Sequence, residues 1–485
     1  MNRRRFFQNL GVGAILSSPW TLSRGETQSH GMEAFAGAGK YLLLDDRIIE
    51  RAEDVSLELG KVVKEVQNPL FVEDKPWEVR FDNLYPNVLF DEQEQMFKCW
   101  YNPFTVDEAT SMTPPEQRKL ISHRQAALGR FSEMGVCYAT SKDGIVWNKP
   151  ELGMIDFGGS RQNNLVARGP EGVGIWKDLR DPQPERRFKM FFVPASSKGI
   201  QSPLAVAFSP DGLHWSKSIG CEPIHARGDT HNNALWAESL GEYVGITRLW
   251  EEGMRVVGRC ESHDFFNWTP AVRCLAGDKE HQTYAMLVFP YASVYLGLVM
   301  IFRTEPDLVD CELAWSPDTI DWKRVAPGTP LIPRGPQGSQ DWGCIYAAAY
   351  PILNGAEIRL YYGGSDGPHT NWRKGSFCLA RLGKDRFCGL RPSTGTKVGT
   401  VVTKPILCTG KHLRVSADAA GGSLRVGVLG AEPFSLEACR RIATDVTDCP
   451  VEWKDTHTLD ALKGRQIRVC FEMQASKVYA FSFAD

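Results

Sequence analysis

The chain has 485 residues, of which 42% are hydrophobic and 24% are charged. This is the composition of an ordinary soluble globular protein, at a length that exceeds one typical domain. The 56 Lys and Arg residues nearly balance the 58 Asp and Glu residues, so the formal net charge is −2. Because no long basic run is present to hold a phosphate backbone, the sequence argues against nucleic acid as a partner.

The N-terminal segment carries three consecutive arginines, Arg3-Arg4-Arg5, followed by Phe6 and an apolar stretch that runs to Ser18. Paired arginines ahead of a modest apolar segment resemble a twin-arginine export signal, the alternative being a basic cytoplasmic tail. The apolar part is too short to span a bilayer stably. We therefore predict a signal and linker over residues 1–38, and an exported protein, periplasmic or extracellular, with no membrane span after export.

A short motif, S-x-D-G-x-x-W, recurs along the first two thirds of the chain. It is complete at Ser141–Trp147 and Ser209–Trp215, whereas Ser262–Trp268 and Ser316–Trp322 keep its Ser, Asp and Trp but lose the Gly. Ser and Asp side chains bond backbone amides just ahead of them, Gly takes the positive φ of a tight turn, and Trp buries a large ring. We interpret each copy as a structural hairpin tip with no catalytic role.

Apolar, aromatic-rich strands precede the copies of the motif, for example at Phe97–Tyr101 and Phe188–Phe192. A fifth strand pair, Ile358–Tyr362 with Phe377–Arg381, lacks the motif. Repeated units of short strands are typical of a β-propeller, which has about four to eight blades. We predict an all-β protein: a five-bladed β-propeller over residues 39–393 and a small C-terminal β-sandwich over residues 394–485.

A polar, helix-compatible insertion lies between Thr105 and Gly129 and interrupts the first predicted blade. Long loops on a repeat scaffold are either decoration or functional lids. Two interpretations stay open for this insertion: a surface decoration, or a lid over one face of the propeller.

Carboxylates stand at the predicted openings of the innermost strands. They are Asp82, Asp229, Asp341 and, at the fourth opening, Glu280. Inner strands line the central channel, so we expect these groups to meet around one water-filled pocket. Glycoside hydrolysis needs such a set, because one carboxylic acid protonates the leaving oxygen while a second acts as nucleophile or as base for water. For any single member, the alternative is a turn or cap at the start of a strand.

Amides, imidazoles, aromatic rings and arginines near the same openings are candidate substrate-binding groups. They are Asn83, Asn163, Asn164, His231, Asn232, His281, Tyr284, Arg248, Arg303, Trp342 and His369. Asn163 and Asn164 are predicted to open the second blade. The alternative for the two arginines is an ion pair between blades, and for His369 a solvated loop position.

The 13 cysteines are scattered singly, with no C-x-x-C and no His pair at metal-binding spacing. This pattern does not indicate a zinc site, and we expect no metal and no cofactor, while a calcium ion in the channel is left open.

The predicted strands, the acids at their openings and the terminal sandwich resemble a superfamily of five-bladed propeller glycoside hydrolases, the invertase/levanase and arabinanase/xylosidase-like enzymes. A set of segments is further similar to exported, planctomycete-type members: Tyr41–Asp46, Asn68–Trp77, Ala139–Trp147, Asn163-Asn164 and Tyr479–Phe483. The resemblance implies an exported glycosidase acting on a plant or algal polysaccharide or an oligosaccharide derived from it. In it, Asp82 matches the first-blade acid and Asp229 a second acid.

The chain departs from the superfamily in three places. No W-M-N-D-P-N-G stands in the first blade, and the second blade offers amides where the superfamily has its third Asp. In the third blade, Cys260-Glu261 reverses the Glu-Cys order of the invertase acid. A non-catalytic carbohydrate-binding propeller is therefore the alternative function, and a scaffold for a cell-surface partner is a third.

Overall fold

The computed structural model describes residues 39–195, 204–395 and 397–485. The predicted export signal over residues 1–38 lies outside the described residues. Within these ranges the chain is built of strands, with only two short α-helices, α1 (Glu108–Met112) and α2 (His123–Ala126), and the predicted all-β class is confirmed. None of the helices in this part of the chain is long and apolar enough to cross a membrane.

Strands paired in chain order form five antiparallel groups. They are β6 (Asn87–Asp91), β7 (Met96–Tyr101), β9 (Ser132–Ser141) and β10 (Leu165–Arg168); β11 (Glu171–Lys177), β12 (Phe188–Val193), β13 (Ala205–Ser209) and β14 (Ile219–Gly220); β15 (Asn233–Ala237), β16 (Glu242–Glu251), β17 (Met254–Ser262) and β18 (Val272–Leu275); β19 (His281–Tyr291), β20 (Val294–Arg303), β21 (Leu308–Ser316) and β22 (Lys323–Val325); and β23 (Cys344–Ala347), β25 (Glu357–Ser365) and β26 (Gly375–Gly383). The extra strand β8 (Phe104–Asp107) pairs with β9, and β24 (Ile352–Asn354) with β25.

The last two groups share one ten-stranded sheet, because β21 and β23 are bridged in parallel at Val309 and Cys344. The exact blade count of five therefore stays a prediction. Asn163 and Asn164 precede β10, the outermost strand of the first group, so they do not open the second blade as predicted; that inner strand is β11.

The predicted hairpin tips are confirmed in atomic detail. At the first copy the Ser141 hydroxyl accepts the Gly144 N–H (2.8 Å), and Asp143 accepts the N–H groups of Ile145 and Val146, both at 2.8 Å. Gly144 has φ +75°. Where the motif has lost its Gly, Phe265 and Thr319 take the same left-handed conformation, with φ 68° and 69°.

Each hairpin tip also accepts a hydrogen bond from a side chain of a neighbouring group. The bonds run from Tyr361 to the Gly144 carbonyl (2.9 Å), from Trp100 to the Gly212 carbonyl (2.7 Å), from Arg186 to the Asp264 carbonyl (2.7 Å), and from Arg259 to the Thr319 hydroxyl (2.8 Å). Each bond ties a tip to the preceding group, and the first tip to the last group, as a closed ring requires.

Two N-terminal strands complete the last group. β4 (Val63–Lys64) and β5 (Phe71–Val72) pair with β26, so a segment far away in the sequence closes this sheet. The pairing covers an otherwise open edge of β26.

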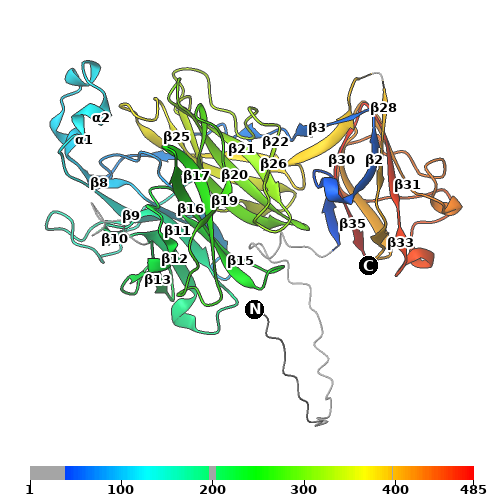
Figure 1. Ribbon diagram of the computed structural model, residues 1–485, viewed down its shortest axis with the longest axis horizontal. Helices are drawn as coiled ribbons and strands as arrows, with labels where there is room; N and C mark the ends of the chain where they lie inside the picture. Colours follow the sequence, from blue (N-terminus) through cyan, green and yellow to red (C-terminus); the bar gives the residue numbers. More distant parts are fainter. Residues whose placement is uncertain (1–38, 196–203, 396) are drawn as a thin grey trace, which may run out of the picture.

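The remaining strands form a β-sandwich, which lies beside the propeller strands, on the right in Figure 1. One sheet contains β3 (Val55–Leu59), β27 (Cys388–Pro392), β35 (Lys477–Ala484), β30 (His412–Asp418), β32 (Val446–Pro450) and β1 (Lys40–Leu42); the other contains β2 (Ile49–Glu53), β28 (Val398–Thr403), β34 (Val469–Gln474) and β31 (Ser423–Val428). The short pair β29 (Ile406–Leu407) and β33 (Gln466–Ile467) stands beside them.

The division between the two parts differs from the predicted boundary at residue 393. Strands β1, β2 and β3 and strand β27 belong to the sandwich, although the prediction placed them in the propeller. The physical reason is that pairing decides to which sheet a strand belongs. Here β1 pairs with β35, β2 with β28 and β3 with β27, all partners hundreds of residues away in the sequence.

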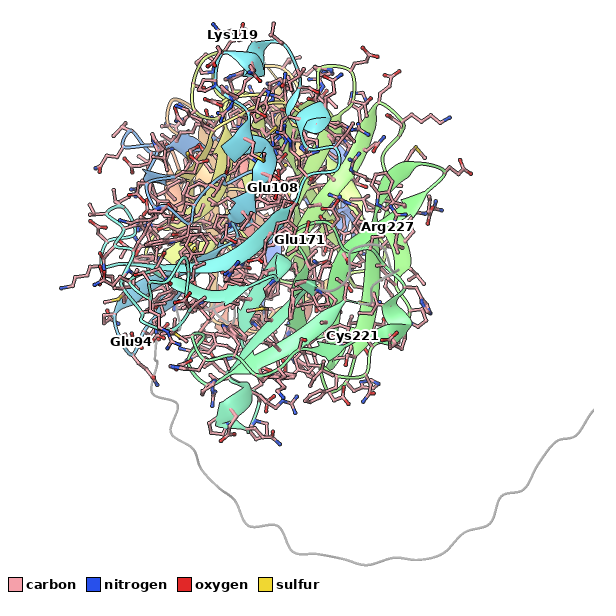
Figure 2. All side chains as sticks on the ribbon, turned by 90° about the vertical axis from the view of Figure 1, so that its left-hand side faces the viewer. Glu94, Glu108, Lys119, Glu171, Cys221 and Arg227 are labelled. Carbon is pink, nitrogen blue, oxygen red and sulfur yellow. The ribbon has the colours of Figure 1, made fainter. Side chains whose placement is uncertain are left out.

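The inner strands begin at one end of the propeller. Three contacts between their first residues fix this level: Asn87 to the Val173 carbonyl (2.8 Å), Asn232 to the Gly172 carbonyl (3.0 Å) and Thr230 to the Tyr284 carbonyl (3.1 Å). The insertion with Lys119 lies at the top in Figure 2, and Glu94, just after the far end of β6, lies well below it. We call the end where the inner strands begin the entry face.

Candidate functional site

A tightly kinked segment carries the first candidate acid to the entry face. Asp82, Leu84 and Tyr85 have φ values of 53°, 61° and 43°. Such conformations cost about 1–3 kcal/mol each in non-glycine residues and persist only where the surroundings enforce them. Here the buried side chains of Phe81 and Leu84 anchor the kink, while the Asp82 side chain keeps 19% of its surface exposed.

Two arginines hold the Asp82 carboxylate. Arg373 Nη2 lies 2.5 Å from Asp82 Oδ1, and Arg80 Nη1 bonds the same oxygen. Burial acts to raise the pKa of Asp82, but the charges of Arg373 and Arg80 outweigh it and hold this pKa below its usual value. Asp82 is therefore an ionised carboxylate, suited to act as nucleophile or base and unsuited to donate a proton.

Asn83 connects Asp82 to a group of tyrosines. Its side-chain oxygen accepts from Arg373 Nη2 (2.8 Å), and its amide nitrogen donates to the hydroxyls of Tyr85 (2.7 Å) and Tyr284 (2.9 Å). Burial raises the pKa of Tyr85 well above its usual value, so its hydroxyl stays protonated. A phenol hydroxyl both donates and accepts hydrogen bonds, as the hydroxyls of a sugar do.

Arg248 links these tyrosines to the second candidate acid. Its guanidinium lies 4.1 Å from the centre of the Tyr284 ring and donates to the Tyr284 carbonyl at 2.7 Å. Its Nη1 lies 3.4 Å from Asp229, whose side chain is 63% exposed. Asp82 and Asp229 are thus joined through a continuous chain of contacts, and the structure brings both to the same end of the propeller.

The residues described so far form one cluster at the entry face: Asp82, Asn83, Tyr85, Arg248, Tyr284 and Arg373. His369 belongs to this cluster, so the alternative of a solvated loop position does not hold. Its Nδ1 lies 2.9 Å from the Tyr346 hydroxyl, and its ring packs 4.8 Å from the ring of Tyr284. Burial first, and then the charge of Arg373, lower the pKa of His369 well below its usual value. The imidazole is therefore neutral and serves as a hydrogen-bonding partner.

The insertion reaches this cluster. His123 in α2 lies 3.0 Å from Asp107, which also pairs with Arg80 at 2.7 Å. On its outer side the Trp372 indole donates to the Ile121 carbonyl at 2.8 Å. These contacts dock the insertion against the loop that carries His369 and Arg373, which favours the lid interpretation over surface decoration.

Two predicted acids lie outside this cluster. Asp341 is buried in an ion pair with Lys64 (2.5 Å) and accepts from the Tyr362 hydroxyl (2.9 Å), so its carboxylate is engaged by the N-terminal strand β4. It does not join Asp82 and Asp229 as expected. Glu280 is exposed just before β19, at the rim of the entry face.

Several predicted binding residues have structural contacts instead. The Asn164 amide donates to Tyr101 and to the Tyr138 carbonyl, both at 2.7 Å, and Asn163 donates to the Ile155 carbonyl at 2.8 Å. The Asn232 amide bonds three carbonyls, the shortest at 2.8 Å. The amide groups of these residues are used in hydrogen bonds to backbone carbonyls, which explains why such residues stand at strand openings.

The other predicted binding residues lie near the cluster or at its rim. His231 is buried beneath Tyr85, with ring centres 5.2 Å apart, and burial lowers its pKa to about 3. His281 lies 3.2 Å from Asp278, and Arg303 lies 3.7 Å from Asp310; both are partly exposed. Trp342 is half-buried next to Asp341.

Sequence reasoning missed Arg80, Tyr85, Arg373 and Tyr346 as members of the cluster. Tyr85 and Tyr346 each stand at the opening of an inner strand, so their position was a usable signal. A further missed carboxyl is Glu73, which accepts from the N–H groups of Phe81 and Gly375 at 3.0 Å, beside the segments that carry Asp82 and Arg373. Burial raises the pKa of Glu73.

A separate cavity of about 580 Å³ opens at the opposite end of the propeller, where the inner strands end; its lining includes Phe90, Trp176, Trp236, Pro290 and Pro351. Its charged groups are paired: Lys177 with Asp91 (2.9 Å) and Arg180 with Glu238 (2.7 Å). In the part of the chain that the structure describes, no group of three or more His, Cys, Asp or Glu side chains is placed to hold a metal ion.

No protein-family model matches the chain, and no curated protein matches it. Among solved structures, a β-1,2-mannobiose phosphorylase from Listeria innocua is 16% identical, covering 67% of this chain and 97% of its own, with a TM-score of 0.47. The α-L-arabinofuranosidase PaAbf62A from Podospora anserina is 11% identical, covering 66% of this chain and 97% of its own, with a TM-score of 0.43. At these values the likeness does not identify a function for this chain.

Proposed function

We propose that the protein is an exported glycoside hydrolase, built as a five-bladed propeller, that cleaves a plant or algal polysaccharide or an oligosaccharide derived from it at the entry face. One observation carries the proposal: the partly exposed, ionised carboxylate of Asp82, held by Arg80 and Arg373 beside the hydroxyl-bearing cluster. A carboxylate fixed in one orientation is what attack on an anomeric carbon, or activation of a water, requires.

The roles follow from the electrostatics. Asp82 is the nucleophile or base, because its lowered pKa keeps it ionised. Asp229 is the second carboxyl group and the candidate acid for the leaving oxygen. Tyr85, Tyr284 and Arg248 position sugar hydroxyls between them, and the insertion limits access of water. Separation of the two carboxyl groups would then set the stereochemical outcome, with about 5–5.5 Å for retention and about 6.5–9.5 Å for inversion.

The test is a reducing-end assay over a panel of plant and algal polysaccharides. Wild-type protein, Asp82→Asn and Asp229→Asn are compared on every glycan. We expect activity on at least one glycan for the wild type and strong loss in both variants. Full activity of both variants would remove these residues from the mechanism.

A non-catalytic carbohydrate-binding propeller is the second candidate. It is favoured by the ion pair between Asp341 and Lys64, which leaves fewer free acids at the entry face than the resemblance implies. Calorimetric binding of a glycan that is never cleaved would support this function over hydrolysis.

A further inference from the structure

Arg255, at the start of β17, is a guanidinium without a carboxylate partner among the described residues. Its Nη1 donates to Gln282 at 3.0 Å, while its Nε is buried with no hydrogen-bonding partner. Among the described residues its Nη2 donates no hydrogen bond either, so most of its five N–H donors are unused. Unsatisfied buried donors are costly, which raises the question of what compensates them.

Aromatic rings surround this guanidinium. It lies 4.7 Å from the centre of the Trp250 ring, 5.0 Å from Phe302 and 5.4 Å from Tyr284. The rings hold the plane of the guanidinium without using its N–H groups. A planar, immobilised guanidinium with free donors matches the geometry of a carboxylate.

The position of Arg255 connects it to the entry-face cluster. Tyr284 packs against both Arg255 and Arg248, so the two guanidinium groups flank one ring. The charges that act on Arg255 include Arg248 on β16 and Asp229 before β15, and Asp229 is already in contact with Arg248 at 3.4 Å. One positive charge is therefore left uncompensated beside the candidate acids.

We propose that Arg255, beside Arg248, forms a subsite for the carboxylate of a uronic-acid residue, so that the glycan recognised at the entry face is acidic. This inference rests on the proposed carbohydrate function and narrows its substrate class. The tyrosine hydroxyls bind the remaining hydroxyl groups of the same sugar, and the carboxylate fills the unused donors of Arg255.

The test measures binding rather than turnover, so that it stands apart from the hydrolysis proposal. Full-length protein is titrated calorimetrically with oligogalacturonate and with its methyl-esterified, neutral form, and likewise with D-glucuronate and D-glucose. We expect the wild type to prefer the acidic member of at least one pair by about 10- to 100-fold, the range of a charge-assisted pair.

Three variants sharpen the test. Arg255→Met should abolish the preference while leaving binding of the neutral form unchanged, and Arg255→Lys should restore part of it. Arg273→Met, which removes a mostly exposed arginine paired with Glu251, is the matched control and should behave as wild type. Asp82→Asn should keep the preference even if it loses turnover, which separates failure of this inference from failure of hydrolysis.

Inorganic phosphate and sulfate form the last arm, because a free oxyanion could fill the same donors. Binding of phosphate at the affinity of the uronate, lost equally in Arg255→Met, would overturn the sugar-acid assignment. Equal affinity of wild type for acidic and neutral glycans, or a preference unaffected by Arg255→Met, would also overturn it.

Discussion

Replacing Asp82 by Asn separates the chemical role of this side chain from its structural one. The amide keeps the size of the carboxylate and one oxygen acceptor, but it removes the charge. Arg80 retains Asp107 at 2.7 Å, and Arg373 retains Asn83 at 2.8 Å, so neither guanidinium is left without a partner. The fold should therefore survive the substitution.

The expected magnitudes differ for stability and for activity. One charge-assisted hydrogen bond is worth about 1.5–3 kcal/mol, and the partial exposure of Asp82 reduces this to about 1–2 kcal/mol of unfolding free energy. Loss of a nucleophile or base lowers kcat/KM by about 10²- to 10⁴-fold, which corresponds to about 2.7–5.4 kcal/mol in the transition state. Activity should fall much further than stability does.

The assay compares Asp82→Asn with Asp341→Asn, a matched substitution at a buried, ion-paired Asp. Asp341→Asn should lower the unfolding free energy at least as much, because it leaves Lys64 without its carboxylate, yet its kcat/KM per folded molecule should equal that of the wild type. Urea unfolding and glycan hydrolysis are measured on the same samples. Equal activity losses in the two variants would show that Asp82 has no chemical role beyond its contribution to the fold.

Three further predictions concern the ion pair, the hairpin tips and the insertion. The folded-state pKa of Asp82 lies below its unfolded value of about 4, so the stabilisation by the Asp82 carboxylate is complete above that pH and is lost as the pH falls toward the folded pKa. The difference in urea stability between wild type and Asp82→Asn should therefore shrink from pH 5 to pH 2. A difference that grows over this range would contradict the assignment of an ionised Asp82. Asp143→Ala should cost about 1 kcal/mol of stability by freeing two backbone N–H groups, with activity unchanged; unaltered urea unfolding would show that the tip needs no Asp. Trp372→Ala should expose residues 108–131 to limited proteolysis, because the bond to Ile121 is lost; wild-type cleavage rates would indicate that other contacts hold the insertion.

Local turn chemistry made the hairpin tips predictable. The side chains of Ser141 and Asp143 act within three residues of their own position, so the sequence alone carries the signal. The closure of the last propeller group was not predictable in this way. Phe71 pairs with Phe377 across some three hundred residues, and no periodic pattern in either segment names the other.

The candidate site was predicted only in part, because some of its residues are marked by their local position and others depend on contacts far away in the sequence. Asp82, Tyr284 and Arg248 were singled out by their place at or next to inner strands, and they do lie together. Asp341 stands at an equivalent place in the sequence, but Lys64 arrives from the strand that closes the sheet and neutralises it. Arg373 was missed because it lies in a loop whose path over the entry face depends on the whole ring.

The most direct measurement is a crystal structure of Asp82→Asn with a bound oligosaccharide that the wild type cleaves. We predict a sugar at the entry face, with its anomeric carbon about 3–3.5 Å from the residue 82 side chain or from a water held by it. A sugar bound instead in the cavity at the opposite end, between Trp176 and Trp236, would contradict the assignment of the site.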